Sequence, residues 1–569
     1  MTRRYPVRVR LSPYRVLKFL MTSFLLEELV LCGYISGSLL LISLLKIKET
    51  SWGWGTKKVF FFLFRTACVS LVMTFLLSLW SFFSEWETLL VDGQTLTDVR
   101  VRLVVLYDLP GHGLIRQDLL TRTFGLLLNV LMLFYLFLMG EYFKKTQKTF
   151  RYTLELPVLL VTIFLSLKIF LIAVDLILLV LALELAAYCS IILLGLQTTS
   201  SGANLFSVEA AIKYFIFNAV GVAFLLFSAS GYFSLFASVN LLDVSALGTL
   251  NPLLAYMTTE NILLFQSMFF FGYLIKLGAA PLHQWVPDVY EGAELFLTAL
   301  LVLIVGPVLN LKLFMLAKML LSTGTFSSSP MLWGFLFVGV FSVFWGSFNA
   351  FSQTRIKRFL AYTGITHLGF ILLSFGTGTF FGYIAAFLYL LFYLGANLVF
   401  FSLLIISRQL SGVSLIFLNQ LKLIVNQNAF FLLFFVIPLF SYAGFPPFAG
   451  FFTKLFALAA IIDLNSPKMV LLLVLLIVFS AYLYLRLVKL MLFETSGYSL
   501  LIPLGKAPVY RSYYRLQNYF GQIRRETGYH IMLFFTLFIL NLILAFFVLF
   551  MPLILTSILT PMISLLLFY

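Results

Sequence analysis

The stretch Lys276-Leu-Gly-Ala-Ala-Pro-Leu-His-Gln-Trp-Val-Pro-Asp-Val-Tyr-Glu-Gly292 ends an apolar segment with a lysine, a glycine, a proline and a histidine. Lys276 and His283 are seven residues apart and would share one face of a helix, two turns from each other. Gly278 and Pro281 lie between them, and a proline removes a backbone donor and clashes with the preceding turn. The sequence therefore predicts a broken helix with two titratable groups, which is typical of a membrane protein that moves ions or protons.

The composition of the whole chain places this broken helix in a membrane. Of the 569 residues, 62% are hydrophobic and only 11% are charged, which leaves too little polar surface to cover a soluble globule. We therefore expect a polytopic membrane protein with about fourteen apolar segments long enough to span a bilayer. These segments are 17–45, 59–84, 125–143, 154–172, 175–197, 209–236, 262–283, 295–320, 331–350, 357–376, 380–407, 429–460, 468–493 and 531–550, and the stretch 553–568 is either an extra helix or an extension of the last one.

The basic residues follow the pattern of a membrane protein rather than that of a protein that binds nucleic acid. When the spans cross the membrane alternately, most Lys and Arg residues of the loops fall on one face, in 46–58, 144–151, 351–358, 408–427 and 495–530. This asymmetry obeys the positive-inside rule and indicates a matrix- or cytoplasm-facing side. The basic N-terminal run from Arg3 to Lys18 breaks the rule and resembles an organelle-targeting segment in composition.

The chain lacks the sequence patterns of redox and hydrolytic centres. Cys32, Cys68 and Cys189 are isolated from one another, so they offer neither metal-ligand nor iron–sulfur spacing. The sequence contains no Gly-rich phosphate loop at a strand-to-helix turn and no Ser-His-Asp order that fits the spans. We expect no cofactor in this chain, and any redox chemistry would belong to a partner.

Charged residues inside the spans are the candidates for function. Glu184 follows Asp175 by nine residues, which places it roughly 13 Å deep if Asp175 marks the membrane edge. Glu209 and Lys213 are four residues apart, in the favourable order for a pair on one helix face. Two further lysines, Lys312 and Lys454, lie inside apolar spans, and Lys454 follows a second break at Gly444-Phe-Pro-Pro447. Each charge at a helix centre costs about 2.5–3.5 kcal/mol, so several together indicate a polar interior track.

Simpler interpretations exist for these charges. Lys168, Lys318 and Lys489 lie near span ends, where lysine stems reach the interface, and Glu209 is also a candidate for a helix-start carboxylate. Glu184 and Lys276 would alternatively form a buried pair that only fixes helix registry. His283 is also a candidate for a hydrogen-bonded interface residue, and Lys312 is open between the interior and snorkelling from its span.

Five motifs resemble one family. They are Ser207-Val-Glu-Ala-Ala-Ile-Lys-Tyr214, the stretch Lys276–Gly292, Gln353-Thr-Arg-Ile-Lys-Arg-Phe-Leu-Ala-Tyr-Thr-Gly-Ile-Thr-His-Leu-Gly369, Gly444-Phe-Pro-Pro-Phe-Ala-Gly-Phe-Phe-Thr-Lys454 and Tyr484-Leu-Arg-Leu-Val-Lys489. In this order they resemble the family of subunit 2 of mitochondrial NADH:ubiquinone oxidoreductase (respiratory complex I) and of the bacterial antiporter-like N subunits. The motifs cover roughly residues 150–495, whereas the first 120 and the last 70 residues match weakly.

The resemblance implies an all-α membrane fold with two five-helix repeats of inverted topology, each with a broken helix. The corresponding division is 1–124 for N-terminal helices and a polar loop, 125–285 and 286–495 for the two repeats, and 496–569 for a basic loop and C-terminal helices. The helix breaks would be at Gly278, Pro281, Pro446 and Pro447.

The resemblance also implies a set of residues for proton translocation, namely Glu184, Lys213, Lys276, His283 and Lys454. Two positions depart from the family pattern. Counted from His283 without a gap, the position at which the family has a lysine is Gly306, so Lys312 corresponds to that lysine only if an insertion is allowed. In addition, Glu294 replaces the usual proline after the Glu-Gly-Ala turn.

These features together predict a non-redox, proton-translocating membrane-arm subunit of complex I in the mitochondrial inner membrane. Its partners would be other membrane-arm subunits and the lipid bilayer, and FMN, iron–sulfur clusters and ubiquinone would be bound by partner subunits. Three alternatives remain open: a subunit of an Mrp-type cation/proton antiporter, the plastid or cyanobacterial counterpart of the complex, and a scaffold subunit that does not pump.

Overall fold

The computed structural model describes residues 27–42, 56–91, 114–115, 119–145, 154–196, 198–199, 202–203, 205–244, 252–321, 330–411, 415–421, 429–446, 448–464 and 466–492. Several features expected from the sequence lie outside the described residues: the spans 531–550 and 553–568, the basic N-terminal run, the loop 495–530 and Pro447. The side chain of Lys318 also lies outside them.

The described part of the chain is predominantly helical, and its two strands, β1 (Thr198–Thr199) and β2 (Gly202–Ala203), are two residues long and pair with each other. Within it, nine helices are long and apolar enough to cross a membrane. In a bilayer the backbone N–H and C=O groups must bond to each other, and a helix achieves this within one segment. The expected all-helical membrane architecture is confirmed at this level.

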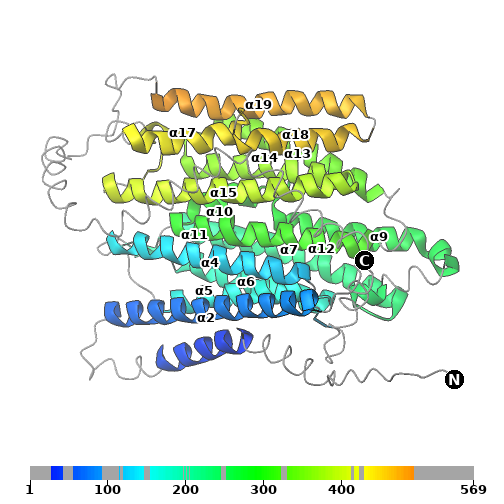
Figure 1. Ribbon diagram of the computed structural model, residues 1–569, viewed down its shortest axis with the longest axis horizontal. Helices are drawn as coiled ribbons and strands as arrows, with labels where there is room; N and C mark the ends of the chain where they lie inside the picture. Colours follow the sequence, from blue (N-terminus) through cyan, green and yellow to red (C-terminus); the bar gives the residue numbers. More distant parts are fainter. Residues whose placement is uncertain are drawn as a thin grey trace, which may run out of the picture. The chain divides into compact units, whose positions relative to one another are not determined.

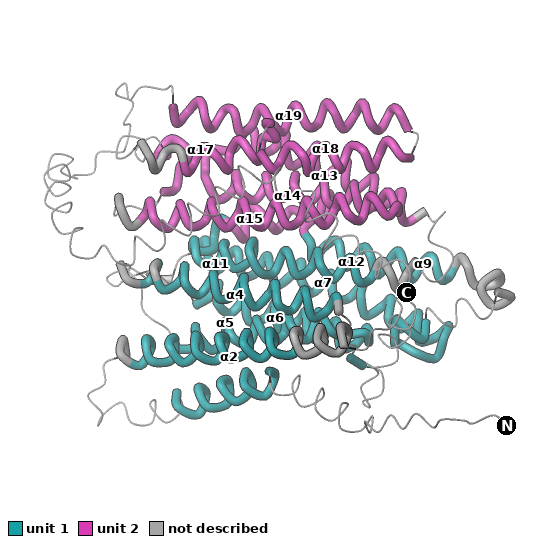
Figure 2. Tube along the Cα trace, in the orientation of Figure 1, with its two compact units in different colours: residues 1–277, 291–327 teal, residues 278–290, 328–569 magenta. Residues whose placement is uncertain are grey.

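Two compact units divide the chain, and Figure 2 shows them in different colours. Unit 1 holds residues 1–277 and 291–327, and unit 2 holds residues 278–290 and 328–569. The helices of unit 1 are 27–42, α2 (Thr56–Val91), α4 (Leu119–Lys145), α5 (Leu156–Ile172), α6 (Leu176–Gly195), α7 (Leu205–Phe236), α9 (Pro252–Leu277), α11 (Leu295–Leu300), the π-helical turn η2 (Leu301–Val305) and α12 (Gly306–Leu321). Within this unit α5 packs against α6, α6 against α7, and α7 against α9 (Figure 1).

Unit 2 consists mainly of α13 (Pro330–Ser352), α14 (Ile356–Gly376), α15 (Phe380–Ser411), the 3-10 turn η3 (Leu418–Leu421), α17 (Ala429–Ala443), α18 (Ala449–Ile462) and α19 (Pro467–Leu492). Most of the short helix α10 (Trp285–Gly292) also belongs to it. Here α13 packs along α14, α14 along α15, and α18 against both α14 and α15.

Helix boundaries follow from the residues that occupy them. Pro252, Pro330 and Pro467 stand at the first positions of α9, α13 and α19, where the missing N–H of proline is not needed. Asp175 precedes α6, and its carboxylate accepts a hydrogen bond of 2.9 Å from the backbone N–H of Ile177. This bond satisfies one of the free donors of the first turn.

The chain leaves helical geometry at both expected breaks. Helix α9 ends at Leu277, and Gly278 follows with a φ of 72°. Helix α17 ends at Ala443, and Gly444 follows with a φ of 84°. Only glycine adopts such a backbone readily, so these two residues end their helices and turn the chain toward α10 and α18.

Candidate functional site

Lys276 lies in the last turn of α9, where it donates a hydrogen bond to Oδ1 of Asn218 on α7. Glycines bring the two helices close together at this point. A Cβ atom on Gly272 would lie 2.8 Å from the carbonyl oxygen of Gly221. Because small residues let helix backbones approach each other, the lysine one turn after Gly272 meets the face of α7 that carries Asn218.

Glu184 lies in the middle of α6 and is half-buried in this chain. Its carboxylate accepts a hydrogen bond of 3.3 Å from the hydroxyl of Tyr188, one turn further along the helix. The charge of Glu184 is close enough to act on Lys276, so the structure brings these two residues into one electrostatic environment.

Glu209 and Lys213 form the ion pair that their spacing predicts, with 2.7 Å between the carboxylate and the ammonium. Their side chains are 58% and 38% exposed in this chain. The pair thus lies on the surface of unit 1, on α7, and not in its interior.

Lys312 is buried in the interior of unit 1, with only 1% of the residue exposed. Its ammonium donates to the backbone carbonyls of Leu171 at 2.9 Å and Ala173 at 2.6 Å. Helix α5 ends at Ile172, and the last carbonyls of a helix lack partners within it and carry partial negative charge. Lys312 therefore neutralises the C-terminal end of α5 from the neighbouring α12.

A hydrogen bond joins the helices that carry Lys276 and Lys312. The hydroxyl of Tyr273 on α9 donates to the carbonyl of Leu309 on α12 at 2.5 Å. Each lysine follows its bonded residue by three positions, so both stand one turn beyond this contact.

His283 lies in unit 2, within the irregular segment between α9 and α10, and is 5% exposed. Its ring stands edge-on to Trp345 and Tyr362, with 6.3 Å between the ring centroids in each case. Among the described residues its Nδ1 has no hydrogen-bond partner.

Lys454 repeats in unit 2 the arrangement of Lys312 in unit 1. It is 3% exposed, and its ammonium donates to the carbonyls of Tyr442 at 2.9 Å and Ala443 at 3.0 Å. These carbonyls belong to the C-terminal end of α17, directly before the break at Gly444. A third contact of 3.3 Å runs to the hydroxyl of Ser480 on α19. Of the expected prolines in this break, Pro446 is described and exposed.

A buried histidine beside Lys454 was not among the residues selected from the sequence. His367 on α14 is 2% exposed, and its ring nitrogens lie 3.0 Å from the hydroxyl of Tyr389 and 2.8 Å from that of Tyr484. The ring of Tyr442, whose carbonyl binds Lys454, lies 5.1 Å from the His367 ring. A histidine inside the apolar span 357–376 was the sequence signal for it.

Lys168 corrects one expectation. We expected its stem to reach the membrane interface, but the side chain is buried and forms an ion pair of 2.6 Å with Glu27. The partner lies 141 positions earlier in the chain, on another helix, so no local pattern links the two. Lys489, in contrast, is exposed near the end of α19.

No group of three or more His, Cys, Asp or Glu side chains in the described ranges is arranged to hold a metal ion. The candidate site thus consists of carboxylates, amines, imidazoles and hydroxyls. These groups hold and pass protons.

Residues 173–480, more than half of the chain, match the transmembrane family described as NADH:quinone oxidoreductase/Mrp antiporter. The chain is 32% identical to NADH-quinone oxidoreductase subunit N of Ruthia magnifica, over 51% of this chain and 58% of that protein. It is 30% identical to NADH-ubiquinone oxidoreductase chain 2 of Marchantia polymorpha, over 57% of this chain and 64% of that protein. In both cases the matched region spans less than two thirds of the relative's own length.

Solved structures share the fold at lower sequence identity. A chain of respiratory complex I from Thermus thermophilus superposes with a TM-score of 0.59 and 21% identity, over 83% of this chain and 91% of that one. A chain of the Mrp complex from a Dietzia species gives a TM-score of 0.62 and 18% identity, over 83% of this chain and 81% of that one. On the family match and this shared fold, the chain belongs to the NADH:quinone oxidoreductase/Mrp antiporter transmembrane family.

Proposed function

We propose that this chain is a proton-translocating membrane-arm subunit of NADH:quinone oxidoreductase. The similarity to subunit N and chain 2 proteins supports this assignment over other members of the family. The observation that carries it is Lys276 at the end of an interrupted helix, bonded to Asn218 and within the field of Glu184.

Glu184 and Lys276 control the proton in this proposal. Burial disfavours the ammonium form of a lysine, whereas a nearby carboxylate favours it. Protonating Glu184, or moving it away, thus makes Lys276 release its proton. A change imposed on Glu184 from outside the chain is thereby converted into proton movement.

Other groups would carry the proton within each unit. In unit 1 these are Lys213 at the surface and Lys312 in the interior. In unit 2 they are His283, Lys454 and the histidine His367, which is surrounded by tyrosine hydroxyls next to Lys454. The burial of Lys312 supports its use in place of the family's missing lysine at Gly306.

We also propose that the complete chain has about fourteen spans and two inverted repeats of five helices. The two breaks support this, because each follows an apolar helix and opens with a glycine of positive φ. The repeats would occupy 125–285 and 286–495, between the regions 1–124 and 496–569. The relative from Marchantia supports a mitochondrial inner membrane location.

The chain would act without a cofactor of its own. FMN, iron–sulfur clusters and ubiquinone would be bound by partner subunits of the complex, and this subunit would be driven by quinone reduction there. Its partners would be the other membrane-arm subunits and the lipid.

Mass spectrometry of the complex that copurifies with the chain tests this assignment. We expect flavin-containing and iron–sulfur subunits together with NADH oxidation activity. Copurification with antiporter subunits alone would identify an Mrp-type complex instead. Normal proton pumping after neutralisation of Lys276, Lys312 and Lys454 would identify a scaffold subunit.

A further inference from the structure

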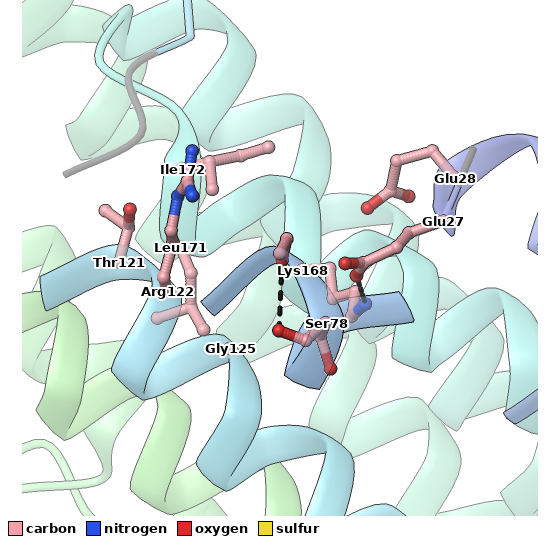
Figure 3. Close-up of a pocket in the computed structure, with 10 residues that line it drawn as sticks. Glu27, Glu28, Ser78, Thr121, Arg122, Gly125, Lys168, Leu171 and Ile172 are labelled. Carbon is pink, nitrogen blue, oxygen red and sulfur yellow. Dashed lines mark hydrogen bonds and ion pairs between the residues drawn. The ribbon is translucent and has the colours of Figure 1, made fainter. Parts of the chain in front are cut away.

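Unit 1 contains a charged cavity that the proposed proton pathway does not use. Its volume is about 50 Å³, and helix 27–42, α2, α4 and α5 contribute to its walls (Figure 3). The charged residues that line it are Glu27, Glu28, Arg122 and Lys168, and Ser78 and Thr121 add hydroxyl groups. A polar cavity of this size has room for a few water molecules.

Glu27 and Lys168, two of the four charges, form the ion pair of 2.6 Å, and their side chains are only 12% and 7% exposed. The dashed line between them in Figure 3 marks this contact. Glu27 is the carboxylate that Lys168 contacts in this cluster, and Glu28 is the second carboxylate of the cavity.

One oxygen of the Glu28 carboxylate lacks a partner in the described part of the chain. Its Oε2 is buried and has no hydrogen-bond partner among the described residues. The charges that act on it are the cation of Lys168 and the anion of Glu27. A buried carboxylate oxygen without a partner is costly, and either a water molecule or a proton on the carboxyl group removes that cost.

The cavity also adjoins the interior lysine of unit 1. Leu171 and Ile172 line it, and the carbonyl of Leu171 accepts the hydrogen bond of 2.9 Å from Lys312. One wall of the cavity thus contains a residue whose carbonyl binds Lys312.

We propose that this cavity is a hydrated proton-binding site in which Glu28 carries an exchangeable proton. Cavity water passes a proton to the Glu28 carboxylate, which becomes a neutral acid, and takes it back when the carboxyl group ionises. The cation of Lys168 favours the carboxylate and the anion of Glu27 disfavours it, so these two charges set the balance. Arg122, which also lines the cavity, remains charged because guanidinium keeps its proton. The proton on Glu28 does not rest on the proposed function.

Infrared difference spectroscopy of the intact complex in H2O and D2O tests this site. At neutral pH we expect a protonated-carboxyl band that shifts in D2O and is lost in Glu28→Gln. Glu155→Gln, which removes a carboxyl group outside the cavity, should leave the band unchanged. Glu28→Asp retains a carboxyl group and should move the band, so it decides the matter if Glu28→Gln does not assemble.

The same band reports the influence of Lys168. In Lys168→Met we expect it to persist to higher pH, because the cation that favours the carboxylate is gone. If no band depends on residue 28, the four charges are only a structural ion cluster that anchors helix 27–42, and the proposal is overturned. These spectra require no pumping, so a failure of the proposed function would leave the Glu28 result standing.

Discussion

At the scale of single residues, the groups around Lys276 determine how easily this lysine loses its proton. Its ammonium bonds to the neutral side chain of Asn218, while the charged partner, Glu184, lies on another helix and is half-buried. A lysine that bonds to a neutral amide and interacts with its counter-ion from a distance can lose its proton without leaving a strong ion pair broken.

Lys276→Ala is expected to reduce proton pumping and the quinone reduction coupled to it, with the complex still assembled. Lys276→Arg should be nearly as damaging, because guanidinium stays charged at any accessible pH. Activity and pumping in membrane vesicles, with assembly followed on native gels, measure the effect. Unchanged pumping by an assembled Lys276→Ala complex would remove this residue from the pathway.

Glu184→Gln should reduce activity more at alkaline than at acidic pH. The carboxylate favours the ammonium form of Lys276, so its removal lets the lysine lose its proton at a lower pH, and the deficit grows as pH rises. The ratio of mutant to wild-type rate across pH measures this effect. A ratio that does not change with pH would mean that the two groups are not coupled.

The sequence identified residues whose charge is improbable in an apolar helix. This property singles out Glu184, Lys276 and Lys454. The structure buries Lys454, which is the environment expected for a residue of an interior track. The burial of Lys168 does not follow from the sequence, because its partner Glu27 is distant in the chain. The surroundings of His367 do not follow from it either, because the hydroxyls around this histidine come from α15 and α19, which no local pattern brings together.

At the scale of elements, the helix breaks depend on backbone conformation. Gly278→Ala is expected to destabilise unit 2, since its φ of 72° costs a residue with a side chain about 1–2 kcal/mol, and the new Cβ would lie 2.4 Å from Cγ2 of Val286. Gly334→Ala on α13 is the control, because no heavy atom lies within 4 Å of its Cβ. The temperature at which half of the activity of the complex is lost is measured for both variants and should be lower for Gly278→Ala. Equal temperatures for the two variants would contradict this role of Gly278.

The π-helical turn η2 shows why the orientation of Lys312 was left open by the sequence. A π turn holds an extra residue per turn, so the residues after Val305 no longer follow the phase of α11. Counting at 3.6 residues per turn from the preceding helix therefore gives the wrong face. The presence of apolar spans and the starts of α9, α13 and α19, in contrast, follow from apolar length and from prolines, both of which are local.

At the scale of the whole molecule, each unit exposes apolar side chains that water cannot cover favourably. On α13 of unit 2, Trp333 and Phe337 are 61% and 66% exposed. Such a surface needs lipid or partner subunits around it.

Phe337→Lys should therefore lower the amount of assembled complex, because a charge at the centre of a span costs about 2.5–3.5 kcal/mol. Phe337→Leu, which keeps the position apolar, should assemble normally. The abundance of the complex in membranes measures both variants. Normal abundance of the lysine variant would show that this face of α13 meets water.

Lys312 and Lys454 both donate hydrogen bonds to the carbonyls at the C-terminal end of a helix. The protonation state of each lysine therefore affects how firmly that helix end is held. An ammonium has three N–H donors and a full charge, and a neutral amine has two weaker donors. When either lysine releases its proton, the end of α5 or α17 loses the cation that bonds its last carbonyls. Loss of the proton thus weakens the hydrogen bonds that hold the helix end to the lysine, and return of the proton strengthens them again.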